Sequence, residues 1–150
     1  MSNATRFTLF AMLMWTVATA AQEIRISRSE LPAAVEATVQ KQEGKLKAKA
    51  FYKEREHGQT FYEIAMRGDG NKRDLRLDEK GNIVEVEEEV PFAMLPANVK
   101  SVLVAEAGSG KIHKIETVTS SGRTHYEATI TNEGKTREIT IDTNGNVLRE

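Results

Sequence analysis

Residues 58–84 read GQTFYEIAMRGDGNKRDLRLDEKGNIV, and residues 122–148 read GRTHYEATITNEGKTREITIDTNGNVL. The two stretches align without a gap when position 58 is placed on position 122, a shift that we call the repeat offset. Upstream, the same offset places Leu31-Pro32-Ala33 on Leu95-Pro96-Ala97. Chance does not put a Tyr-Glu pair, a Leu-Pro-Ala triplet and several glycines at one spacing. The chain therefore contains an internal repeat, and the fold must be built from two similar units.

Each unit is predicted to open with a helix. Pro32 and Pro96 suit a first helical turn, where the missing N–H is not needed. Gly44 and Gly108 stand where a left-handed residue would end each helix. Four short strands bounded by turn residues follow in each unit. We expect these strands at 46–56, 60–67, 72–77 and 83–87, and at 111–119, 124–131, 135–141 and 146–149.

Alternation along the strands assigns their faces. The side chains expected to cover the helices are Tyr62, Ile64, Met66, Leu75, Leu77, Tyr126, Ala128, Ile130, Ile139 and Ile141. Those expected on the opposite face are Phe61, Glu63, Asp74, Arg76, His125, Glu127, Glu138 and Thr140. Apolar residues three apart, Ala48 with Phe51 and Ile112 with Ile115, predict a bulge in the first strand of each unit. The result is an α+β fold of two tandem units, each a helix plus a four-stranded antiparallel sheet.

The first residues are typical of a secretory signal peptide. Arg6 is the only charged side chain before an apolar run, FTLFAMLMWTV at 7–17, and small residues follow it at 18–21. Cleavage after Ala20 or Ala21 would leave a mature chain beginning near Gln22. The other interpretation is an N-terminal hydrophobic helix within a soluble domain. We expect a signal peptide at 1–21, repeat 1 at 22–90 and repeat 2 at 91–150, in a periplasmic or secreted protein.

Composition excludes several classes of function. The 21 Lys and Arg balance 22 Asp and Glu, for a net charge of −1, whereas nucleic-acid binders normally carry a basic excess. The chain has no cysteine, which excludes disulfides, thiolate zinc sites, iron–sulfur clusters and a cysteine nucleophile. With no disulfides, the protein must be stabilised by its apolar core.

The spacing of Leu31-Pro32, Val35, Gly58, Tyr62-Glu63 and Asp78-x-x-Gly81-Asn82, which recurs at the repeat offset, resembles the PepSY-like family, also described as β-lactamase-inhibitor-like. The resemblance covers nearly all of the chain after residue 21. It implies a periplasmic or secreted, non-enzymatic domain that binds or restrains other proteins, peptidases in particular. It also implies that the two units lie side by side in one curved sheet. No motif carries a particular contact residue over from the family.

No motif supports catalysis or a bound cofactor. Gly108-Ser109-Gly110-Lys111 lacks the first glycine and the final Ser or Thr of a phosphate-binding loop. Asp142-x-Asn144-x-Asn146 lacks the glycine of a calcium loop, since Val147 stands in its place. The histidines at 57, 113 and 125 do not have metal-ligand spacing. We therefore expect no catalytic residue, no cofactor and no metal.

Two features single out a partner-binding surface. Glu85, Glu87, Glu88 and Glu89 form the one local concentration of charge, which either solvates an edge strand or docks a basic partner. Phe61 is an aromatic residue on the expected outer face, and Phe51 or Tyr52 near it would make an interface anchor. We expect a monomeric, exported protein- or peptide-binding module, an inhibitor or regulator of an envelope or secreted enzyme such as a peptidase. The alternative is a small-ligand or metal-binding envelope protein. Neither nucleic acid nor membrane insertion after cleavage is expected.

Overall fold

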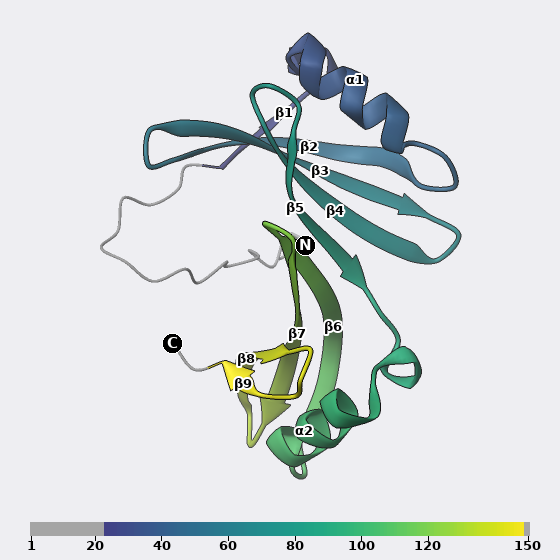
Figure 1. The fold of residues 1–150 in the computed structure, drawn as a ribbon, viewed down its shortest axis with the longest axis vertical. Helices are drawn as coiled ribbons and strands as arrows, with labels where there is room; N and C mark the ends of the chain where they lie inside the picture. The colour runs from purple at the N-terminus through teal and green to yellow at the C-terminus, as the bar shows by residue number, and fades with distance from the viewer. Residues whose placement is uncertain (1–22, 149–150) are drawn as a thin grey trace, which may run out of the picture.

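The computed structural model describes residues 23–148 as one antiparallel sheet with two helices (Figure 1). The expected signal peptide and its cleavage site lie outside the described residues. None of the described helices is long and apolar enough to cross a membrane. In chain order the elements are β1 (Ile24–Ile26), the 3-10 turn η1 (Arg28–Glu30), α1 (Ala33–Gln42), β2 (Lys47–Glu56), β3 (Gln59–Gly68), β4 (Asn71–Asp78), β5 (Ile83–Glu89), η2 (Phe92–Met94), α2 (Ala97–Ala107), β6 (Lys111–Ser120), β7 (Arg123–Asn132), β8 (Lys135–Asp142) and β9 (Val147–Leu148).

The nine strands of the described residues follow one another in the sheet in the order in which they occur in the sequence. The α+β class and the antiparallel pairing are confirmed, but the grouping into two four-stranded units is corrected. β5 pairs with β4, where Arg76 lies opposite Glu85, and also with β6, where Glu85 lies opposite Ser120. Because β5 is hydrogen-bonded to a strand on each side, it belongs to the sheet of repeat 1 and to the sheet of repeat 2 at once. The two repeats consequently form a single sheet.

The repeat offset holds for whole elements. α1 and α2 begin at Ala33 and Ala97, and β2, β3 and β4 have the same lengths as β6, β7 and β8. β1, which was not predicted from the sequence, is the counterpart of residues 88–90, at the end of β5. β9 is the counterpart of residues 83 and 84, at its start. β5 therefore closes repeat 1 and opens repeat 2, so the boundary expected at residue 90 falls at the end of a shared strand.

Both helices cover the same face of the sheet. α1 buries Val35 and Val39 against β2, β3 and β4, and Val86 of β5 packs on this cluster. α2 buries Val99 and Leu103 against β6, β7 and β8, and Val90 packs there. Val86 and Val90 are four residues apart along the same stretch of chain, so they point to the same side. In Figure 1, α1 lies at one end of the sheet and α2 at the other.

The predicted faces and bulges are confirmed. Most of the expected helix-side residues are buried, among them Ile64, Leu77, Ile130 and Ile141 at 0% exposure, with Tyr126 partly buried. The register shifts at Ala48/Ala50 and at Ile112/Lys114, as the apolar spacing predicted. The helix ends differ from each other. Gly108 has φ +55° and ends α2 as expected, but α1 ends at an extended Glu43, so the left-handed role predicted for Gly44 is wrong.

Candidate binding surface

The candidate surface is the helix-free face of the sheet, opposite α1 and α2. On β5 the side chains alternate, so that Glu85, Glu87 and Glu89 point to this face while Val86 and Glu88 point to the helix side. The acidic run predicted as one patch is thus divided between two faces. Glu88 pairs with Arg73 on the helix side, with Arg73 Nε donating to Glu88 Oε1 over 2.6 Å.

Cross-strand pairing brings more carboxylates to the same face. Residues directly opposite each other in a sheet share a face. Glu89 lies opposite Glu116, which lies opposite Glu127. Asp74 lies opposite Glu87, and Glu63 lies opposite Arg76. We call Glu63, Glu85, Glu87, Glu116 and Glu127 the acidic centre.

The acidic centre is electrostatically strained. Burial and, to a smaller extent, the carboxylates of Glu116, Glu85, Glu63 and Glu127 raise the pKa of Glu87 to about 8. Burial, helped by neighbouring carboxylates and opposed by Arg76, raises the pKa of Glu63 to about 7. The pKa values of Glu85 and Glu116 are raised as well, mainly by burial. Near neutral pH this surface therefore holds protons on groups that would be ionised in water.

Basic side chains lie around the acidic centre and pair with carboxylates at its margins. Lys72 Nζ lies 2.8 Å from Glu89, Lys114 Nζ lies 2.6 Å from Glu116, and His125 Nε2 lies 2.9 Å from Glu127. Arg67 pairs with Asp74. Within the described part of the chain, Glu63, Glu85 and Glu87 form no ion pair with a basic side chain. The middle of the face can thus accept cationic groups from elsewhere.

Phe61 occupies this face beside the acidic centre, but its surroundings differ from those expected. The Arg76 guanidinium lies over the Phe61 ring, 4.1 Å from the ring centroid, and pairs with Glu54 and Glu56. Phe51 belongs to the core under α1, so it cannot join Phe61 in an interface. Tyr52, opposite Glu63, shares the helix-free face. The aromatic candidate is therefore half-covered by an arginine.

The structure gives the histidines ordinary partners. His113 shares a hydrogen bond of 2.9 Å with Thr131, and His125 contacts Glu127. Across residues 23–148, no group of three His, Cys, Asp or Glu residues is placed to hold a metal ion. The arrangement can attract and orient cations.

Part of this surface follows from the amino-acid sequence. Alternation places Glu63 and Glu127 opposite the core residues, because each directly follows a tyrosine of the buried pattern, Tyr62 or Tyr126. Glu116 was missed. It lies beyond the bulge at 112–114, which shifts the alternation of β6, and it is 6% exposed. Its position opposite Glu89 depends on the β5–β6 pairing, which no local pattern encodes.

Comparison with known proteins identifies relatives of this fold. A family model described as "Putative beta-lactamase-inhibitor-like, PepSY-like" matches residues 14–85 and 69–149. A Bacteroides eggerthii structure described among "putative periplasmic proteins" is 15% identical, with a TM-score of 0.66 over 79% of this chain and 86% of that one. A DUF2874 family protein from Bacteroides uniformis gives 15% identity and a TM-score of 0.64 over 79% and 86%.

A BLIP-like protein from Bacteroides fragilis is 17% identical, with a TM-score of 0.59 over 77% of this chain and 82% of that one. At these identities the likeness shows a shared fold. The search of curated proteins found no match.

Proposed function

The chain belongs to the PepSY-like, β-lactamase-inhibitor-like family, and on that premise we propose that it is an exported, non-catalytic protein that binds another protein or a peptide on the helix-free face of its sheet. The observation that carries this proposal is the acidic centre. A broad sheet face without a covering helix, which bears carboxylates left without ion pairs, is suited to a partner that supplies Lys or Arg.

The partner chemistry follows from charge. A basic partner would replace the repulsion among Glu63, Glu85 and Glu87 with ion pairs and release their bound protons. Charge at such a surface mainly sets the encounter rate and the docking register. Phe61 and Tyr52, on the same face, would supply apolar contact beside the charged centre. Glu89, which pairs with Lys72, would contact the partner at the margin of this surface.

We further propose that the partner is an envelope or secreted enzyme, such as a peptidase, which the protein inhibits or regulates. The signal-like residues 1–21 support export, as do structural neighbours described as periplasmic. The relative described as BLIP-like supports an inhibitory role. Glu88 lies on the other face, so it has no part in this proposal.

The test is capture from an envelope extract with the purified chain lacking residues 1–21. The double variant Glu85→Gln/Glu87→Gln should lose the captured protein, while the matched control Glu79→Gln, in the exposed β4–β5 turn, should retain it. Capture should weaken as salt is raised, because the contact is electrostatic. The captured protein is then assayed as an enzyme with and without the chain. Equal capture by both variants would refute the proposed surface. Metal or small-molecule binding without a protein partner would favour the alternative function.

A further inference from the structure

The two repeats differ at the place where the α-helix of the repeat, α1 or α2, meets the start of the strand that follows it, β2 or β6. In repeat 1 this place is closed by a polar cluster centred on Arg28. Its guanidinium donates to Glu36 and Glu43 over 2.9–3.2 Å and lies 5.9 Å from the Phe51 ring centroid. Glu43 Oε1 also accepts the backbone N–H of Ala48 over 3.0 Å. This cluster, which we call the plug, covers the edge of β2.

Repeat 2 lacks the plug. At the repeat offset, Arg28 is replaced by Phe92, Glu36 by Lys100 and Glu43 by Ala107. Two further polar residues of repeat 1 are replaced by apolar ones, Glu30 by Met94 and Gln40 by Val104. Phe92 is 40% exposed, Met94 78% and Val104 58%, so the replacement did not make a larger core. It left three exposed apolar side chains on η2 and α2.

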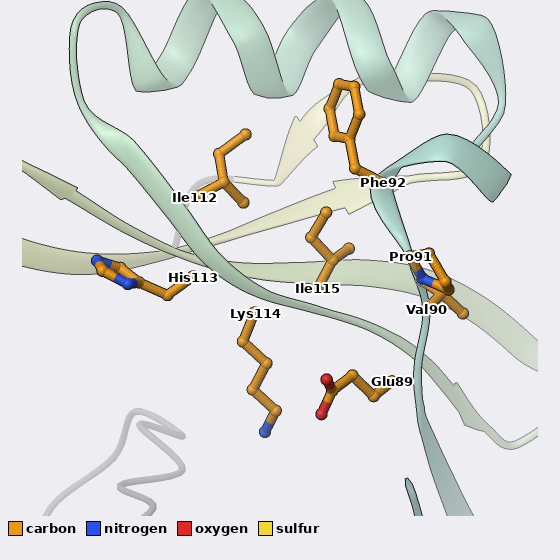
Figure 2. Close-up of a pocket in the computed structure, with 8 residues that line it drawn as sticks. All are labelled: Glu89, Val90, Pro91, Phe92, Ile112, His113, Lys114 and Ile115. Carbon is orange, nitrogen blue, oxygen red and sulfur yellow. The ribbon is translucent and has the colours of Figure 1, made fainter. Parts of the chain in front are cut away.

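A pocket lies beside one of these side chains, Phe92, between the end of β5 and the start of β6 (Figure 2). It has a volume of about 410 Å³. Its apolar walls are Val90, Pro91, Phe92, Ile112 and Ile115. Figure 2 shows Ile112 and Ile115 extending toward α2 beside Phe92, while Lys114 points the opposite way. Phe92, Ile112 and Ile115 are the counterparts of Arg28, Ala48 and Phe51, so this pocket is the site that the plug fills in repeat 1.

The pocket opens onto an uncovered strand edge. The pairing of β5 with β6 ends at Glu89 and Glu116, followed by one bond from the Val90 N–H to the Ile115 carbonyl. Pro91 then has no N–H to donate, and the chain leaves the sheet. Within the described residues, no strand pairs with 111–114 on the side away from β7. The N–H of Ile112 also lacks the acceptor that Glu43 gives to Ala48, because Ala107 has no side-chain oxygen.

The charged residues that line the pocket, Glu89 and Lys114, are each engaged in an ion pair, Glu89 with Lys72 and Lys114 with Glu116. Two further lysines lie near the pocket. Lys111 adjoins Ile112, and Lys100 Nζ donates to the Ala93 carbonyl over 2.6 Å beside Phe92. Neither lysine has a carboxylate partner in the described part of the chain. Lysines and a bulge on an open edge discourage pairing with arbitrary strands. They admit a strand that carries a compensating carboxylate.

We propose that this pocket and the adjoining edge of β6 bind an extended segment of another protein, in which a bulky apolar residue neighbours a carboxylate. The segment adds to the edge at 111–114, so that its carbonyl accepts the Ile112 N–H. Its apolar side chain enters the pocket beside Phe92, and its carboxylate pairs with Lys100 or Lys111. The site adjoins the acidic centre through Lys114, but the residues proposed to bind the segment are not those of the acidic centre. Repeat 1 does not offer this site because the plug occupies the equivalent place.

The test is selection from a phage-displayed library of random peptides against the purified chain. Enriched peptides should share a bulky apolar residue next to Asp or Glu. The synthetic consensus peptide should shift the backbone amide resonances of residues 111–115 and leave those of 47–51 unchanged. Phe92→Arg should weaken its binding about tenfold or more, and so should the graft Phe92→Arg/Lys100→Glu/Ala107→Glu, which rebuilds the plug.

Controls separate this site from other surfaces. Leu148→Ser removes an exposed apolar side chain on β9, which β7 and β8 separate from β6, and should leave peptide affinity unchanged. Glu85→Gln/Glu87→Gln should also leave it unchanged, whatever that pair does to the proposed basic partner. Phe92→Arg changes an exposed side chain and should leave the fold intact, so this single variant still tests the proposal if the triple variant does not fold. Absence of enrichment, equal binding by Phe92→Arg, or resonance shifts confined to β3 and β4 would each overturn the proposal. Binding of small apolar molecules without any enriched peptide would also overturn it.

Discussion

At the scale of single residues, Glu87 shows how a sheet can hold a carboxylate in an unfavourable state. Asp74 lies opposite it on β4, and the carboxylates of Glu116, Glu85, Glu63 and Glu127 surround it. No ion pair in the described residues offsets this repulsion. Burial first, and this repulsion second, raise the pKa of Glu87, and the raised pKa makes folding depend on pH.

Stability should fall as the pH rises from about 5 to 8. In that range the folded protein keeps the protons of Glu87 and Glu63, whose pKa values are about 8 and about 7, while the unfolded chain has lost them. The folded state therefore binds more protons, and its free energy of unfolding decreases with pH. Glu87→Gln, which resembles the protonated carboxyl group, should raise that free energy at pH 8 by roughly 1 kcal/mol and change it little at pH 5.

Urea unfolding at pH 5 and pH 8 measures this difference. Glu79→Gln, in an exposed turn, is the control and should leave the pH dependence unchanged. A stability that increases toward pH 8, or a Glu87→Gln variant with the wild-type pH profile, would contradict the assignment. Carboxylates with lowered pKa values, such as Asp78 and Asp142, lose their contribution to folding stability only at more acidic pH. The two effects on stability therefore fall in different pH ranges.

At the scale of elements, the repeated Asp-x-x-Gly-Asn turn explains one part of the family pattern. Asp78 Oδ1 accepts the N–H groups of Lys80 and Asn82 over 2.9 Å, and Asp142 Oδ1 accepts those of Asn144 and Asn146 over 2.8–2.9 Å. In repeat 1, Thr38 Oγ1 donates to the Gly81 carbonyl over 2.7 Å. The turn therefore also helps to hold α1 on the sheet, in addition to the apolar packing of Val35 and Val39.

Gly81→Ala should destabilise the protein much more than Gly70→Ala. Both glycines have positive φ, +79° and +77°, so the conformational cost of an alanine is similar, roughly 1 kcal/mol. A Cβ at Gly81 would lie 2.4 Å from the Ala34 carbonyl oxygen, whereas nothing lies within 4 Å at Gly70. Forcing α1 away from the turn should add about 2 kcal/mol. Chemical denaturation of both variants measures the difference, and equal losses would show that the contact has no role.

At the scale of the whole molecule, β5 joins the repeats. It supplies Val86 to the core under α1 and Val90, directly after it, to the core under α2. Its backbone also bonds β4 and β6 at once. Neither repeat has its full set of strands without β5, so the two should not be independent domains.

Repeat 2 should fold only when β5 accompanies it. A fragment of residues 83–150 should show a cooperative urea transition, while a fragment of residues 91–150 should show none, because it lacks the strand that covers β6. Circular dichroism during urea titration checks this expectation, with the full chain as the reference. A cooperative transition in the shorter fragment would show that the sheet divides at Pro91 after all.

Local patterns were sufficient for most of the fold and for part of the candidate surface. The strands and bulges were predictable because each depends on near neighbours, such as Tyr62 with Ile64 or Ile112 with Ile115. β1 was missed because it has three residues and only its pairing with Phe51 and its neighbours on β2 makes it a strand. Phe61 was placed on the correct face, but Arg76, which covers it, comes from another strand.

The amino-acid sequence by itself determined that this protein consists of two copies of one unit, because turn glycines, prolines and alternating apolar residues act over a few positions and recur at a single offset. The tertiary structure decided how the copies are joined and what surfaces they present. Strand pairing across β5 merged two sheets into one, split the acidic run between two faces and brought Glu116 beside Glu89. These are long-range contacts, set by which strands meet, and no local pattern specifies them.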